Sequence, residues 1–260
     1  MEVIILPSSK EIGALAADAI EALVRNKPNA VLGLATGSSP LPIYDELARR
    51  HDEDGLSFEK VSGFALDEYV GLPLGHYESY REVIRREFTN RVDVAAPNVH
   101  GPDGAAEDIQ GACEGYEVAI KAAGGIDLQI LGVGTNGHIG FNEPGSSLAS
   151  RTRIKTLAEQ TRQDNARFFD NVDQVPHHVV TQGLGTIMDA RHLVLVAFGA
   201  GKADAVRDFV EGPVSASCPA SILQFHPRAT VIIDEAAASK LAGAATYRHA
   251  FENKPAWQGL

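Results

Sequence analysis

The stretch "IDLQILGVGTNGHIGFNEPGSS", residues 126–147, joins a short hydrophobic run to a loop rich in glycine. The run contains mainly leucine and isoleucine, which is typical of a strand buried on both faces of a sheet. The loop contains glycines with GxGxxG spacing that ends at Gly137, and His138 and Glu143 follow directly. The stretch therefore indicates a buried strand whose carboxyl end carries either a dinucleotide site or a proton-transfer site.

Similar runs recur along the chain and predict the fold class. Strand-like runs begin at residues 3, 30, 61, 126, 192 and 229. Helical apolar spacing occurs between them, at about 9–25, 39–50, 76–89, 105–123, 201–211 and 235–247. This alternation indicates an α/β fold with a doubly wound, mostly parallel sheet and helices on both faces, Rossmann-like and in a single domain over 1–260. The segment at about 140–185 has weak periodicity, and we expect it to be an excursion or lid.

The composition excludes several classes of function. The chain has 260 residues, and its 23 basic and 34 acidic residues give a net charge of −11, so neither nucleic acid nor an anionic membrane is an expected partner. The two cysteines, Cys113 and Cys218, form neither a disulfide framework nor a zinc motif, and we expect no metal. The apolar run before Pro7 is too short for a signal peptide or a membrane span, so we expect a cytoplasmic protein.

The glycine loop departs from a dinucleotide-binding turn. Such a turn needs a helix that begins at the last glycine and an acidic residue about 20 positions later. Gly140 and Pro144 disfavour that helix, and the later segment "RTRIKT" is basic, so we expect no nucleotide cofactor. A turn at Gly140 could instead bring His138 and Glu143 into contact for proton transfer near neutral pH. The alternative is a histidine satisfied by the local backbone beside a solvated glutamate.

Polar residues also follow other strand-like runs. Asp67 and Glu68 come after a run that ends at Leu66, where Asp67 is placed to act as a base. A helix cap or a solvated turn is the alternative there. Because the carboxyl ends of parallel strands meet at one edge of the sheet, we expect Asp67 and His138 to lie at the same edge.

Two further turns could hold a phosphate. Thr36, Gly37 and Ser38 lie between a strand and a helix, where free amide groups and hydroxyls can bind an anion, although no Walker motif is present. Lys202 follows another strand and could complement the negative charge. Ordinary helix capping and a solvated lysine are the alternatives.

The segments "ATGSSPLPIYDEL", "LDEYVGLP", "GTNGHIGFNEPGSSLASRTRIKT", "DNARFFD" and "FGAGKA" together resemble the glucosamine-6-phosphate deaminase family. The resemblance implies conversion of glucosamine 6-phosphate and water to fructose 6-phosphate and ammonium, in amino-sugar catabolism. This is an aldose–ketose isomerisation coupled to deamination, and it uses no metal or organic cofactor. The alternatives are a 6-phosphogluconolactonase-like hydrolase on a similar scaffold and a non-catalytic regulator that binds sugar phosphates.

The resemblance also implies roles for the catalytic residues. Asp67 matches the general base that moves the C2 proton, and His138 matches the group that opens the sugar ring. Glu143 would hold His138. Asn136 stands where the better-known family motif has an aspartate, and an amide can orient a neighbour but cannot titrate.

Two anion sites follow from the same resemblance. The positions that match the substrate phosphate site are Thr36, Gly37, Ser38, Arg167 and Lys202. The positions that match a site for the activator N-acetylglucosamine 6-phosphate, at a subunit boundary of allosteric members, are Ser146, Arg153, Lys155 and Thr156. If that segment is extended, the spacing predicts Arg151, Arg153 and Lys155 on one face. A solvated basic strand or an intersubunit ion-pair patch is the alternative. The family forms homo-oligomers, often hexamers, and we expect an oligomer here.

Overall fold

The computed structural model describes residues 1–73 and 75–260 and contains a central sheet of seven strands. The strands are β1 Glu2–Leu6, β2 Val31–Leu34, β3 Ser62–Ala65, β5 Val99–His100, β6 Leu128–Leu131, β9 Leu193–Ala197 and β10 Ala229–Asp234. Their order is β1-β10-β9-β6-β2-β3-β5, and all neighbours are parallel. Strands β2, β6 and β9 are buried along their whole length, which explains their continuous hydrophobic runs. Six predicted strands are confirmed.

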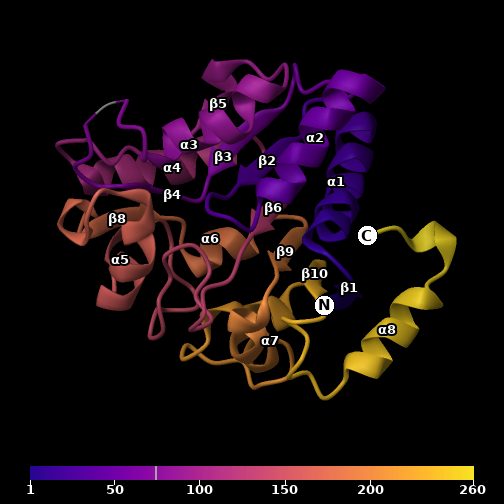
Figure 1. The fold of residues 1–260 in the computed structure, drawn as a ribbon. Coiled ribbons are helices and arrows are strands. Elements are labelled where there is room, and N and C mark those ends of the chain that lie inside the picture. Colours follow the sequence, from indigo (N-terminus) through magenta and orange to yellow (C-terminus); the bar gives the residue numbers. More distant parts are fainter. Residues whose placement is uncertain (74) are drawn as a thin grey trace.

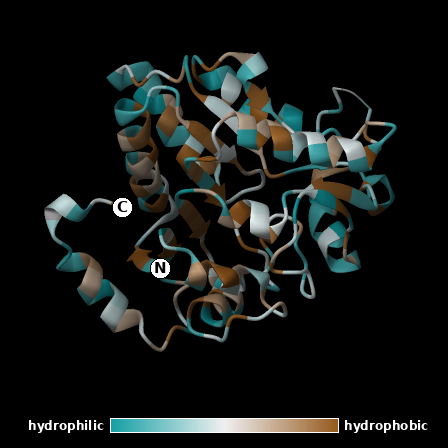
Figure 2. Ribbon diagram, turned by 180° about the vertical axis from the view of Figure 1, so that it is seen from behind, coloured by the Kyte–Doolittle hydropathy of each residue, from teal (hydrophilic) through white to brown (hydrophobic). Residues whose placement is uncertain are grey.

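Helices surround the sheet, which confirms the predicted α/β class (Figure 1). They are α1 Ser9–Asn26, α2 Leu41–Asp54, α3 Tyr80–Glu87, α4 Ile109–Ala122, α6 Leu184–Met188, α7 Ala203–Val210 and α8 Ala244–Glu252. Figure 2 shows hydrophobic strands inside and helices that are hydrophilic on their outer surfaces. Helix α1 begins after Ser8, whose side chain accepts a hydrogen bond from the Glu11 amide, as an N-cap does. In the described part of the chain, no helix is long and apolar enough to cross a membrane.

The predicted helix at 235–247 is wrong, because the last helix spans Ala244–Glu252. Side-chain carboxylates hold the preceding segment in turns. Asp234 accepts a hydrogen bond of 2.7 Å from the Ala237 amide, and Glu211 accepts one of 2.7 Å from the Gly243 amide. These bonds satisfy backbone donors in a conformation that competes with the helix favoured by the alanine-rich sequence.

A second, antiparallel sheet of three strands was not predicted. It has the order β4-β8-β7, formed by β4 Asp67–Tyr69, β7 Arg153–Thr156 and β8 His178–Thr181. A small hydrophobic core of its own lies beneath it, made of Tyr69, Phe141, Leu157, Val175 and Val179. Helix α5 Glu159–Asn165 lies beside this sheet in Figure 1, with the short 3-10 helices η3 Ala166–Phe168 and η4 Val172–Gln174. The weakly periodic segment 140–185 thus contributes β7 and β8 to the second sheet, whose third strand, β4, directly follows β3 of the main sheet.

The order of strands in the main sheet has a topological switch point between β2 and β6. From β2 the chain continues to β3 on one side, whereas from β6 it continues to β9 on the other. Loops that leave neighbouring strands in opposite directions open a crevice at the carboxyl edge, where α/β proteins bind ligands. The two loops approach each other closely, since a Cβ on Gly132 would lie 3.1 Å from Ser39 Oγ. The predicted residues Thr36, Gly37 and Ser38 follow β2, Asn136 and His138 follow β6, and Lys202 follows β9, so they lie at this edge.

Candidate functional site

The loop after β6 holds the His138 ring against a glycine. A Cβ on Gly134 would lie 2.2 Å from His138 Cε1, so only glycine leaves room for the imidazole at this position. Gly137 has φ +82°, a left-handed conformation that glycine adopts without strain and that reverses the chain before His138. The chain then forms a bridge between Ile139 and Asn142, so the prediction that no helix begins at Gly137 is confirmed.

Asn136 connects His138 to Glu143. The Asn136 Oδ1 atom lies 2.7 Å from His138 Nδ1, and the Asn136 Nδ2 atom donates a hydrogen bond of 2.7 Å to Glu143 Oε2. His138 Nδ1 and Glu143 Oε2 are 3.6 Å apart, so the predicted contact between the two residues is made mainly through the amide. The ionised carboxylate can only accept, and the amide nitrogen must therefore face it. Nδ1 then carries the ring proton, and Nε2 of the neutral ring has the free lone pair.

Both carboxylate oxygens of Glu143 are hydrogen-bonded. The second oxygen, Oε1, accepts a bond of 2.5 Å from the Thr161 hydroxyl on α5. Burial by itself would raise the pKa of Glu143, but His138, Thr161 and Asn136 outweigh it and lower the pKa to about 2. The carboxylate is therefore ionised at neutral pH and can stabilise a protonated His138. Thr161 was not predicted, because a threonine in a weakly periodic segment gives no signal of its own.

Asp67 is buried and lies over the same loop. The residue is 6% exposed, and a Cβ on Gly140, two residues after His138, would lie 3.8 Å from Asp67 Oδ2. Within the described residues no group donates a hydrogen bond to its carboxylate. Burial, and then the charge of Glu68, raise the pKa of Asp67 well above its usual value. Glu68 itself accepts hydrogen bonds from backbone amides at the start of α3, as expected for a structural residue.

The residues predicted to bind phosphate lie in two groups. Thr36, Gly37 and Ser38 follow β2, and Gly37 has φ +90°. Lys202 lies at the end of the short 3-10 helix η5 Ala200–Lys202 after β9. Burial, and then the charge of Arg167, lower the pKa of Lys202, and the charge of Asp164 opposes them. Among the described residues, the side chains of Thr36, Ser38, Arg167 and Lys202 make no hydrogen bond or ion pair with one another or with any other residue. These donors are therefore available to an anion.

The residues predicted to bind an activator lie around β7. Arg153 and Lys155 share one face of the strand and alternate with the more exposed Ile154 and Thr156. Burial lowers the pKa of Arg153. Ser146 is 4% exposed, and in the part of the chain that the structure describes its hydroxyl has no hydrogen-bond partner.

Arg151 does not join this face, contrary to the prediction. It precedes β7 and forms ion pairs with Glu117 at 2.5 Å and with Asp189 at 2.7 Å. Glu117 also accepts a hydrogen bond of 2.8 Å from the Thr152 amide, which anchors the start of β7 to α4. Two cations, not three, are thus left on the face of the strand.

The site is assigned by its chemistry and not by the size of a cavity. A cavity of about 650 Å³ lies at the opposite edge of the sheet, between α1 and the C-terminal residues, with His192 and Arg228 in its lining. It contains none of the predicted site residues, and it lies at the amino ends of the strands, where parallel sheets rarely bind ligands. Within residues 1–73 and 75–260, no group of three His, Cys, Asp or Glu side chains could hold a metal ion.

The chain matches a known family over most of its length. The family model described as "Glucosamine-6-phosphate isomerases/6-phosphogluconolactonase" matches residues 8–232. The chain belongs to this family. Its two named activities share the α/β scaffold described above, so individual relatives are needed to distinguish them.

Similar proteins are named as deaminases. The chain is 74% identical over 260 residues to the glucosamine-6-phosphate deaminase of Arthrobacter sp. (strain FB24), covering 100% of both chains. It is 63% identical to that of Mycolicibacterium smegmatis, again covering 100% of both chains. A solved structure described as a monomeric glucosamine-6-phosphate deaminase has a TM-score of 0.90 and 42% identity, over 92% of this chain and 100% of that one. The 6-phosphogluconolactonase from Trypanosoma cruzi shares the fold, with a TM-score of 0.74 and 20% identity over 93% of this chain and 97% of that one.

Proposed function

We propose that the chain is a glucosamine-6-phosphate deaminase, which converts glucosamine 6-phosphate and water to fructose 6-phosphate and ammonium. The observation that carries the proposal is a buried carboxylate, Asp67, with no hydrogen-bond donor in the described residues and beside the His138 loop. Lactone hydrolysis needs no base placed for a carbon-bound proton. The names of relatives at 74% and 42% identity support the same activity.

The first step is opening of the sugar ring by His138. Nε2 takes the proton of the anomeric hydroxyl, and the imidazolium returns it to the ring oxygen as the C1–O5 bond breaks. Asn136 holds Nδ1–H, and the ionised Glu143 stabilises the transient cation. The amide takes the bridging position of the family aspartate, and the charge is supplied by Glu143.

The second step is proton transfer from C2 to C1 by Asp67. The ammonium group on C2 acidifies the adjacent proton, so a carboxylate suffices when it is held in contact. Burial strengthens Asp67 as a base, and the substrate ammonium favours its ionised form. Transfer of a proton from the ammonium nitrogen to O1 gives an enolamine, and return of the C2 proton at C1 then gives an iminium at C2. Water adds to this iminium to form a carbinolamine, which releases ammonium as the C2 ketone forms. Thr36, Gly37, Ser38, Arg167 and Lys202 would hold the phosphate during these steps.

Ammonium release distinguishes this function from its alternatives. Purified protein is given glucosamine 6-phosphate and, as a control, 6-phosphogluconolactone. We expect ammonium and fructose 6-phosphate from the first and no hydrolysis of the second above the spontaneous rate. Lactone hydrolysis without ammonium release would identify the hydrolase, and binding of both compounds without turnover would identify a regulator.

A second part of the proposal is an activator site for N-acetylglucosamine 6-phosphate on Ser146, Arg153 and Lys155; Thr156, which lies on the opposite face of β7, is left out of it. The unpartnered, buried Ser146 hydroxyl and the two cations on one face of β7 support it. Coupling between two sites must be reciprocal, so the activator and the substrate should tighten each other's binding equally. Substrate saturation is measured with and without the activator in wild type and in Lys155→Glu. If the activator leaves the substrate saturation curve of the wild type unchanged, this face of β7 has only a structural role.

The third part of the proposal concerns the oligomeric state of the protein. The resemblance implies a homo-oligomer, often a hexamer, whereas the solved structure at 42% identity is described as monomeric. Light scattering on the purified chain measures its mass directly. A hexamer would supply the subunit boundary that the activator site needs, and a monomer would remove that boundary. A cytoplasmic location also stays a prediction, to be checked by cell fractionation.

A further inference from the structure

We propose that Thr161 and Asn165 are positioning residues that couple capture of the substrate phosphate to the geometry of both proton-transfer groups. They lie on the segment 159–168, which is formed by α5 and η3, contains Arg167 near its end and is called here the phosphate arm. The inference rests on the proposed function, because it uses His138 and Asp67 as the reacting side chains. It adds two residues to which that function assigns no role.

Thr161 connects the phosphate arm to His138. The residue is 6% exposed, and its hydroxyl donates the 2.5 Å hydrogen bond to Glu143 Oε1. The other carboxylate oxygen is bonded to Asn136, which in turn contacts the His138 ring. A movement of α5 therefore moves the carboxylate that orients the ring, through three consecutive hydrogen bonds.

Asn165 connects the same arm to the strand of Asp67. Its Nδ2 atom donates a hydrogen bond of 2.9 Å to the Tyr69 hydroxyl. Tyr69 is two residues after Asp67 in β4, and since side chains alternate along a strand, the two lie on one face. The Tyr69 ring also packs edge-on against Phe169, just beyond the arm, with ring centroids 5.7 Å apart. The arm thus holds the position of β4 as well.

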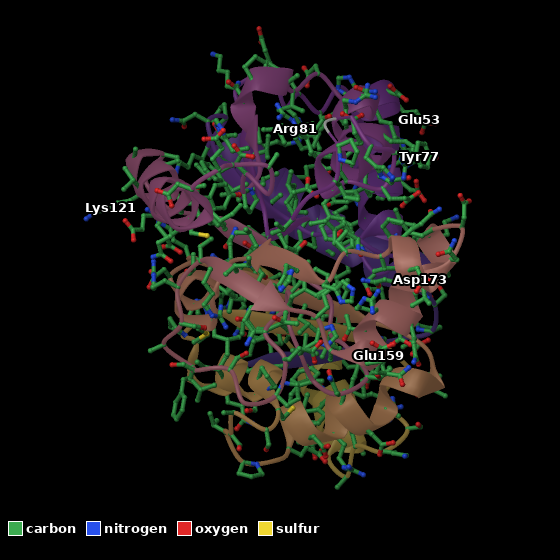
Figure 3. All side chains as sticks on the ribbon, turned by 90° about the vertical axis from the view of Figure 1, so that its left-hand side faces the viewer. Glu53, Tyr77, Arg81, Lys121, Glu159 and Asp173 are labelled. Carbon is green, nitrogen blue, oxygen red and sulfur yellow. The ribbon has the colours of Figure 1, made fainter. Side chains whose placement is uncertain are left out.

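Helix α5 depends on contacts outside the helix for its stability. It has only seven residues, and its N-cap residue Ala158 supplies no side-chain hydrogen bond, so tertiary contacts must stabilise it. Arg162 ties it to η4 by donating to the Val172 carbonyl at 3.0 Å. In Figure 3, Glu159 of α5 and Asp173 of η4 lie on the same side of the molecule. At the other end Arg167 lies over the Phe168 ring and forms no ion pair with a carboxylate among the described residues, and its charge lowers the pKa of Lys202 while Asp164 opposes this. A phosphate held by both cations would fix this end of the arm.

The coupling is tested first without turnover. In protein labelled with ¹⁵N at histidine, the ring resonances of His138, assigned by their loss in His138→Gln, are followed as inorganic phosphate is added. We expect a phosphate-dependent shift in wild type and in Thr161→Ser, and no shift in Thr161→Val, which keeps the shape but loses the hydroxyl. Gln163→Ala, on the exposed side of the same helix, should respond like wild type. A wild-type response in Thr161→Val would overturn the inference whether or not the chain is a deaminase.

Kinetics test the same coupling in the reaction. We expect Thr161→Val to lower kcat by about ten- to a hundredfold, with a smaller change in KM. This is the rate change that corresponds to the loss of one hydrogen bond to a charged group. The acid limb of its kcat profile should move to higher pH, because Glu143 loses a donor that lowers its pKa. Thr161→Ser should restore both properties. A lower Tm with unchanged kcat and pH profile would show a purely structural role and overturn the inference.

A double-mutant cycle tests the second connection. Asn165→Leu and Tyr69→Phe each remove one partner of the same hydrogen bond. We expect each to lower kcat, and the double variant to lose no more than the more impaired single variant, because the lost interaction is shared. Losses that multiply would show that the two residues act independently, which would overturn the role of Asn165. Ammonium release by wild type is measured in parallel, so failure of the proposed function is recognised separately.

Discussion

Gly134→Ala should abolish most of the activity while leaving the fold intact. The new Cβ would lie 2.2 to 2.6 Å from three atoms of the His138 ring. Carbon atoms normally approach no closer than about 3.5 Å, so the ring must move by about 1 Å. A misplacement of this size costs about a hundredfold in rate. Gly134 has no positive φ, so alanine fits the backbone and the loss arises from the displaced ring. The assay is kcat for ammonium release from glucosamine 6-phosphate.

Gly115→Ala is the matched control. Gly115 lies on the exposed side of α4, and a Cβ there would meet no neighbouring atom within 4 Å. We expect unchanged kcat and a gain of about 0.5 to 1 kcal/mol in the free energy of unfolding, the usual benefit of alanine over glycine in a helix. Wild-type kcat in Gly134→Ala would refute the position that we assign to the His138 ring.

Three other predictions use charges at the site. Asn136→Leu should move the acid limb of kcat to higher pH, because Glu143 loses a donor that helps to lower its pKa to about 2; a pH–rate profile measures this. Asp67→Asn should raise Tm at pH 8 but not at pH 3. The raised pKa of Asp67 means that the folded state binds its proton more tightly, so wild type loses stability as the pH rises past the unfolded value of about 3.9. Lys202→Gln should raise KM about tenfold or more with a smaller effect on kcat, as loss of a charge-assisted phosphate contact would; steady-state kinetics measure the ratio.

Buried strands and the edge of the sheet could be predicted from the sequence. The run that becomes β6 is continuous and hydrophobic because the strand is buried on both faces, and the other five runs share this cause. Residues that follow such strands meet at one edge, so the sequence predicts that Asp67 and His138 lie together. The site loop was also predictable in outline, because Gly140 and Pro144 exclude a helix after Gly137.

Long-range hydrogen bonds could not be predicted. The bond from Thr161 to Glu143 joins residues 18 positions apart and depends on how α5 packs on the second sheet. The place of Asn136 between His138 and Glu143 depends on side-chain rotamers, which periodicity does not report. The helix predicted for the alanine-rich segment after β10 was wrong for a related reason, because the Asp234 carboxylate binds a backbone amide and competes with the local helix preference.

The central claim is that buried Asp67 moves the C2 proton of an amino-sugar phosphate. Its most direct test is deuterium incorporation from heavy water into glucosamine 6-phosphate and fructose 6-phosphate, followed by NMR in wild type and Asp67→Asn, with substrate binding measured in parallel. We expect exchange at C2 of the substrate and deuterium at C1 of the product in wild type. We expect neither in Asp67→Asn, although that variant should still bind the substrate through its phosphate. Exchange that persists at the wild-type rate in Asp67→Asn would contradict this account.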